Sequence, residues 1–191
     1  TLVAASRADP DRLQFVALSL YMLGAALYLL IITLVVYRMV FFPLRAREFT
    51  PPYWIDMGAL AVTTLAGSLL VIHAPANSTL AELLPFVRGF TLFFWATATW
   101  WIPLLVILEV WRHAWRHVPL RYETDDWDIV FPIGMYTVGT YELAQALHAG
   151  FLLAIPAAGV YVSLAAWLLV ALIGLRRLYR KGLRHGMHAP R

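Results

Sequence analysis

The chain has 191 residues, of which 61% are hydrophobic and only 14% are charged. Soluble domains usually carry about a quarter of charged residues, so this composition argues against one. The formal net charge is +4, but the basic residues flank hydrophobic runs, where they favour lipid headgroups over nucleic acid. The absence of cysteine excludes disulfides and thiolate chemistry. We therefore expect one transmembrane domain over residues 1–191, with the lipid bilayer and not nucleic acid as its partner.

The first twelve residues, TLVAASRADPDR, precede any long hydrophobic run. They contain no initiator Met and no signal-peptide pattern. We interpret them as the interior of a longer protein and expect the chain to be its C-terminal portion.

Hydrophobic runs then follow one another along the chain, each long enough to cross a bilayer. They cover roughly Gln14 to Phe42, Tyr53 to Ile72, Leu84 to Trp111, Trp127 to Leu147 and Phe151 to Leu175. Because the bilayer core offers no water to backbone groups, each run should be helical. The very short linker before the last run predicts a tight antiparallel hairpin. The fold class is thus an all-α integral membrane bundle of about five transmembrane helices.

Arginines mark one side of this bundle, because they collect in every second loop and in the tail. The segments 73–83 and 148–150 contain neither Lys nor Arg. Basic loops stay in the cytoplasm during insertion, so the pattern predicts a multi-pass protein of the cell membrane. The tail from about residue 176 should be cytoplasmic. The arginines concerned are Arg45, Arg47, Arg112, Arg116, Arg121, Arg176, Arg177, Arg180 and Arg184.

The second run contains small and hydroxyl residues at Gly58, Thr63, Thr64 and Gly67. One interpretation is a pore-facing helix, whose narrow side chains and hydroxyls offer weak hydrogen bonds to a passing ion. The alternative is close helix packing, because small residues let backbones approach each other in lipid. The residues alone favour packing.

The fourth run reads FPIGMYTVGTYELAQAL. Pro132 removes a backbone hydrogen bond and should kink the helix. Helical spacing places Phe131, Val138 and Glu142 on one face, with Met135 close to it. A phenylalanine beside a kink can close a pore by its volume and keep it dry. The alternative is an ordinary packed phenylalanine.

Acidic residues within membrane runs suggest function because their burial is costly. Asp56, Glu109 and Glu142 are the candidates. For Glu142 the functional interpretation is a proton-coupling carboxylate or a vestibule charge. For all three residues the alternative, which the residues favour, is an interfacial carboxylate that reaches water or a basic partner.

His113 and His117 have the i, i+4 spacing that can hold a metal ion, but no third clear ligand accompanies them. We expect no metal. The sequence has no phosphate-binding glycine loop, no nucleophile elbow and no zinc-protease motif. We therefore expect neither an enzyme nor a cofactor.

Three segments carry a family resemblance: TPPYWIDMGALAVTT, FWATATWW and WDIVFPIGMYTVGTYELAQAL. In this order they resemble the C-terminal half of the tellurite-resistance/dicarboxylate transporter and slow anion channel family. The resemblance extends from about Leu13 to Tyr179. Its most specific element is the pattern aromatic-x-x-x-Phe-Pro, here Trp127 to Pro132.

The resemblance implies ten helices arranged as five hairpins around a pore, with an inner helix of each hairpin lining it. The five runs would be helices six to ten, and the second and fourth runs would be inner helices. Phe131 matches the family's gate phenylalanine by its place before Pro132. The second run departs from the family pattern because it has no internal proline.

The function that the resemblance implies is an anion channel or transporter. It would move small anions or dicarboxylates, such as chloride, sulfite or malate, as a homo-oligomer that is a trimer in the family. The alternative is a non-transporting membrane assembly subunit, or a fragment without its own pore.

Overall fold

A computed structural model describes residues 10–46, 48–75, 79–119 and 124–186. The described residues form an all-α structure, as the hydrophobic runs predicted. Its long helices are α2 (Pro10–Phe41), α3 (Tyr53–Ile72), α4 (Thr79–Val110), α5 (Trp127–Ala146) and α6 (Ala154–Gly186). Three short segments connect them: the π-helical turn η1 (Trp111–Trp115) and the 3-10 turns η2 (Thr124–Asp126) and η3 (Gly150–Leu153).

Four helical segments in the described chain are long and apolar enough to cross a membrane. They are Asp11–Phe41, Tyr53–Ile72, Leu80–Trp115 and Gly150–Arg177. The helix outside this set, α5, is as long as α3 but carries Asp128 and Glu142 within its sequence. A polar helix is tolerated in a bilayer where it faces other helices or water. The arrangement of the bundle gives α5 such a position.

Several helix ends differ from the predicted ones. α4 begins at Thr79, before the predicted start at Leu84, and α6 continues past Leu175 to Gly186. Hydropathy marks where a chain leaves the apolar layer, but it does not mark where a helix stops. The residues after Leu175 include Arg and Leu, which are good helix formers, so the helix continues into the basic tail.

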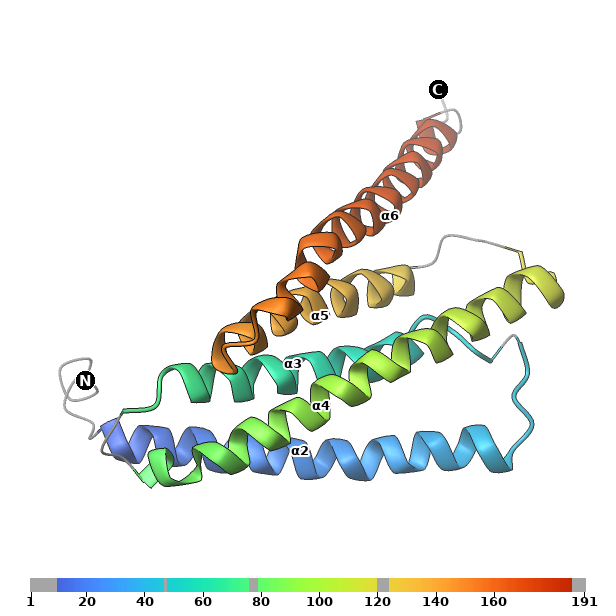
Figure 1. Cartoon of the computed structure of the whole chain (residues 1–191). Coiled ribbons are helices and arrows are strands. Elements are labelled where there is room, and N and C mark those ends of the chain that lie inside the picture. The colour runs from blue at the N-terminus through green and yellow to red at the C-terminus, as the bar shows by residue number, and fades with distance from the viewer. Residues whose placement is uncertain (1–9, 47, 76–78, 120–123, 187–191) are drawn as a thin grey trace.

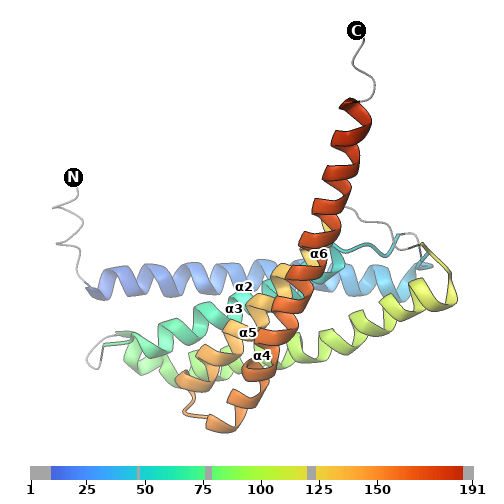
Figure 2. The same ribbon diagram turned by 90° about the horizontal axis from the view of Figure 1, so that it is seen from above.

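α3 occupies the centre of the bundle and packs against α2, α4 and α5. α3 and α5 run parallel and side by side, while α4 crosses them at an angle (Figures 1 and 2). α6 contacts α5 near its own start, and its C-terminal half projects away from the other helices in both views. The structure thus contains two neighbouring parallel helices, α3 and α5, flanked by longer ones.

The core lies where α3 meets α2 and α4. Met57 and Leu60 of α3 are fully buried there, together with Phe94 and Leu105 of α4. Tyr28 of α2 packs edge-on against Phe94, with ring centroids 6.1 Å apart. Aromatic pairs in this geometry add attraction beyond the area that they bury.

Large apolar side chains cover the outer faces of α2 and α6. Leu20, Leu30 and Leu34 of α2 are more than 60% exposed, and Tyr161 of α6 is 78% exposed. Soluble monomers rarely expose an apolar surface this extensive. A bilayer accommodates it because lipid tails are as apolar as leucine.

The linkers after α2 and α4 lie at one end of the bundle, and the turns after α3 and α5 lie at the other (Figure 1). The first end holds Arg38, which pairs with Glu48 at 3.1 Å, and Arg116, which lies over the Trp111 ring at 5.3 Å. The helices therefore alternate in direction as the basic loops predicted. The cytoplasmic location of this end stays a prediction.

Candidate pore-lining face

Two glycines allow α3 and α5 to approach each other closely. A Cβ atom added at Gly58 of α3 would lie 3.0 Å from Cγ of Pro132, and one added at Gly139 of α5 would lie 2.9 Å from the carbonyl oxygen of Ala61. Distances this short exclude a larger side chain unless a neighbour moves. Small residues at such points are typical of membrane helices in close contact. Two contacts, about two turns apart on α5, therefore join these helices.

Hydrogen bonds hold a second side of α5 against α4. Trp95 donates from Nε1 to Thr140 Oγ1 over 3.0 Å, and the hydroxyls of Thr99 and Tyr136 lie 2.8 Å apart. Such bonds between membrane helices contribute about 0.6 kcal/mol each on average. They fix the rotation of α5 about its axis as well as its position.

A third side of α5 packs against α6. Thr137 Oγ1 lies 3.2 Å from Ser163 Oγ, and a Cβ atom added at Gly159 would lie 2.6 Å from the same Thr137 oxygen. The glycine therefore lets α6 cross close to α5 at this level.

The remaining face of α5 is open within the described part of the chain. On it Phe131 is 56% exposed, and Val138 and Tyr141 are each 47% exposed. Met135 and Glu142 are half-buried on the same face. The predicted set of Phe131, Met135, Val138 and Glu142 thus lies together. We call these four residues, with Tyr141, the open face of α5.

The candidate residues of α3 lie in different surroundings. Gly58 faces Pro132, Gly67 is buried beside Tyr21, and Thr64 is buried with its hydroxyl donating to a carbonyl one turn back at 2.9 Å. Within the described part of the chain, these three residues are packed against neighbouring groups. Thr63 is half-buried and lines a groove.

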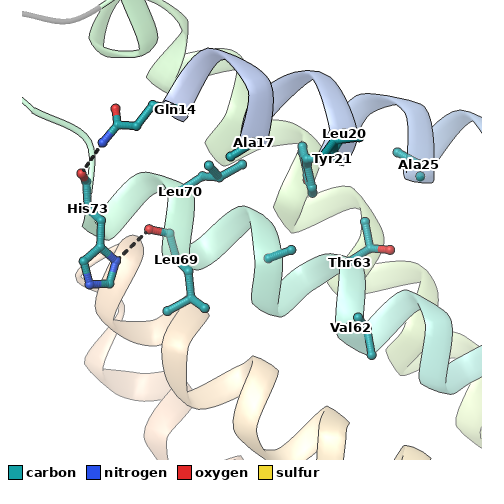
Figure 3. A pocket seen from close by; sticks show the side chains of 12 residues that line it. Gln14, Ala17, Leu20, Tyr21, Ala25, Val62, Thr63, Leu69, Leu70 and His73 are labelled. Atoms are coloured by element: carbon teal, nitrogen blue, oxygen red, sulfur yellow. Dashed lines mark hydrogen bonds between the residues drawn. The ribbon is translucent and has the colours of Figure 1, made fainter. Parts of the chain in front are cut away.

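That groove lies between α2 and α3 and has a volume of about 550 Å³ (Figure 3). Gln14 of α2 closes one end by donating from Nε2 to the carbonyl oxygen of His73 over 2.9 Å. Ala17, Leu20 and Leu69 make its walls largely apolar. An apolar groove suits a hydrocarbon chain or another helix better than an anion, so we do not count it as part of an ion pathway.

Glu109 joins three segments at the end of the bundle that holds the arginines. Trp54 Nε1 of α3 donates to Glu109 Oε1 over 3.2 Å, and His113 Nε2 of η1 lies 3.3 Å from Glu109 Oε2. The residues favoured a carboxylate that reaches water or a basic partner, and His113 is such a partner. The sequence did not reveal Trp54 as a second one, because the two residues are far apart along the chain.

The two histidines of this region point to different carbonyl groups. His113 Nδ1 lies 2.8 Å from the carbonyl oxygen of Val118, and His117 Nδ1 lies 3.1 Å from that of Trp115. In the part of the chain that the structure describes, no group of three or more His, Cys, Asp or Glu side chains is placed to hold a metal.

These features define a class: a multi-pass helical membrane protein in which two parallel helices, packed through glycines, leave an open face rich in aromatic and polar groups. The profile of the voltage-dependent anion channel family matches residues 1–175. The chain belongs to this family. It is a family of channels and transporters, not of enzymes.

Curated relatives of the chain are membrane proteins and a transporter. The chain is 41% identical to an uncharacterized membrane protein of Mycobacterium tuberculosis, recorded in two strains, over 152 residues that make up 80% of this chain and 77% of the relative. It is 25% identical to an uncharacterized transporter of Methanocaldococcus jannaschii over 118 residues, which are 62% of this chain and 33% of that protein. No solved structure matches the chain.

Proposed function

We propose that the open face of α5 lines a pathway for small anions or dicarboxylates, such as chloride, sulfite or malate. The observation that carries the proposal is the uncovered face, apolar from Phe131 to Val138 and polar at Tyr141 and Glu142, on a helix that neighbours hold from three sides. Glu142 and Tyr141 on this face suit water better than lipid tails. Because the chain belongs to a family of anion channels, we expect anions to be the species that move along this face.

Phe131 gates this pathway. Its ring lies on the open face and is 56% exposed, and it directly precedes the proline that packs against α3. An aromatic ring at a constriction blocks by its volume and also resists wetting. Val138 and Met135 continue the apolar stretch beyond it, so the dry segment extends along about two turns of α5.

Selectivity for anions arises without basic side chains on these helices. α3 and α5 contain neither Lys nor Arg. Helix termini and backbone dipoles therefore supply the favourable potential. Glu142 stands near the far end of α5 and acts either as a vestibule charge or as a proton-coupling carboxylate.

Two parallel helices form only part of a wall, so the pathway is completed by further helices. We propose that the protein works as a homo-oligomer, a trimer by family resemblance. The apolar outer faces of α2 and α6 are available for contacts between copies as well as for lipid.

Anion flux through the protein in liposomes tests the proposal, with chloride, sulfite and malate compared. Phe131→Ala should raise flux because it removes both the steric block and the apolar ring that resists wetting. The flux of Phe131→Leu should lie between that of the unchanged protein and that of Phe131→Ala. Phe86→Ala is the matched control, because Phe86 is 55% exposed on α4. If Phe131 only packs, the alanine variant should instead lose stability, by roughly 3–5 kcal/mol on the scale of soluble cores.

Two outcomes would contradict the proposal in different ways. Unchanged or reduced flux in a well-folded Phe131→Ala protein would remove the gate assignment. No flux above empty liposomes in every variant, for every anion, would favour the alternative: a membrane assembly subunit that does not transport, or a fragment without its own pore.

A further inference from the structure

The contact between Gly58 and Pro132 lies directly beside the proposed gate. Gly58 and Pro132 are both buried, whereas the next side chain on α5, Phe131, points to the open face. An added Cβ at Gly58 would lie 3.0 Å from Cγ, 3.2 Å from Cβ and 3.5 Å from Cα of Pro132. α3 therefore contacts α5 at Pro132, the residue next to the proposed gate Phe131.

A displacement of a proline ring moves the backbone more directly than a displacement of another side chain does. The ring is closed onto the backbone nitrogen, so it cannot rotate away from a neighbour as a flexible chain would. A push on Cγ or Cβ of Pro132 must therefore move the backbone of α5 at this position. The peptide bond to Phe131 carries that movement to the gate.

The rest of α5 is anchored independently of this contact. Gly139 meets the carbonyl oxygen of Ala61, and Thr140 and Tyr136 bond to α4. A displacement of Pro132 therefore moves the start of α5, where Phe131 lies, and does not shift the whole helix.

We propose that Gly58 is a positioning residue for the gate: its lack of a side chain lets α3 hold Pro132, and thereby Phe131, in the blocking position. This inference rests on the proposed function of Phe131. In this inference α3 contributes to gating through the contact of Gly58 with Pro132, and it does not need to line the pathway at this point.

The test is Gly58→Ala in the same liposome assay. The added methyl must displace Pro132 by a few tenths of an ångström, which moves the start of α5 away from α3 and widens the constriction. We expect flux to rise roughly fivefold, the factor that corresponds to about 1 kcal/mol of overpacking. Gly89→Ala is the control, because no atom lies within 4 Å of its added Cβ, and its flux should be unchanged.

The double variant Gly58→Ala/Phe131→Ala separates a positioning role from a general loosening of the bundle. If Gly58 acts through Phe131, then Gly58→Ala should add nothing once the ring is gone, so the two changes are not additive. If flux rises by the same factor in both backgrounds, Gly58 does not act through the gate and the inference is overturned.

The outcomes also separate this inference from the proposed function. A rise with Phe131→Ala but none with Gly58→Ala removes the role of Gly58 and leaves the gate. No effect of Phe131→Ala removes both. If Gly58→Ala alone fails to fold, Gly58→Ala/Pro132→Gly should fold and match Pro132→Gly in flux. Glycine removes both Cγ and Cβ of Pro132, and the remaining Cα lies 3.5 Å from the added methyl, an ordinary contact. A difference in flux between these two variants would contradict the inference.

Discussion

Glu109 shows how a single side chain organises one end of this bundle. It is mostly buried, with a side chain 19% exposed, and its two oxygens have different partners. Trp54 Nε1 donates to one oxygen, and His113 lies 3.3 Å from the other. One carboxylate thus links the start of α3, the end of α4 and the π-helical turn η1.

We expect Glu109→Ala to destabilise the protein by about 1–3 kcal/mol, because it leaves the indole N–H of Trp54 without its acceptor in a half-buried setting. Thermal unfolding of the purified protein in detergent measures the effect. Glu82→Ala is the matched control, because Glu82 is an exposed carboxylate near the start of the same helix. Equal melting temperatures for the two variants would contradict a structural role for Glu109.

The sequence predicted some residue environments and could not predict others. Helical spacing placed Phe131, Val138 and Glu142 on one face, and the structure shows them together because spacing within one helix depends only on its own geometry. One of the two partners of Glu109, Trp54, lies 55 residues away along the chain. No local sequence pattern specifies which helices contact each other, so the contact between Trp54 and Glu109 could not be predicted from the sequence.

At the scale of the element, α5 is held on three sides, by α3, α4 and α6. Its glycine contact with α3 and its hydrogen bonds with α4 lie on faces of α5 other than the one that carries Phe131. This explains why a helix less apolar than its neighbours still belongs to the bundle. The polar residues that lower its hydropathy are satisfied by neighbours or lie on the open face.

The other glycine contact between α3 and α5 gives a prediction at this scale. Gly139→Ala would bring a methyl to 2.9 Å from the backbone carbonyl oxygen of Ala61, and backbone gives way less easily than a flexible side chain. We expect a loss of about 1–3 kcal/mol in the free energy of unfolding. Thermal unfolding in detergent again provides the measurement.

Gly24→Ala is the control for this change. It lies in the interior of α2 with no atom within 4 Å of its added Cβ, so it should be neutral or stabilise by roughly 0.5–1 kcal/mol through helix propensity. If Gly139→Ala were as stable as Gly24→Ala, close approach of α3 and α5 would not be a feature of the folded protein.

At the scale of the whole molecule, the relatives differ in how much of their length aligns with this chain. The 152 aligned residues make up 77% of the mycobacterial relatives, whereas the 118 aligned residues make up only 33% of the archaeal transporter. The archaeal transporter is therefore much longer than the segment that it shares with this chain. Within this chain, α2, α3 and α4 share a buried core.

Orientation in the membrane is the last property of the whole molecule that can be tested directly. The linkers after α2 and α4 share one end of the bundle with Arg38, Arg45 and Arg116, and basic loops are retained in the cytoplasm. Because the chain has no cysteine, single cysteines can be introduced at Ala46, in the first linker, and at Ala76 and Ala189, which lie outside the described residues. An impermeant thiol reagent added to intact cells should label only the Ala76→Cys protein, and all three should react once the membrane is opened. Labelling of Ala46→Cys in intact cells would reverse the orientation, and it would place the basic end of the bundle, with Phe131 near it, on the outer side.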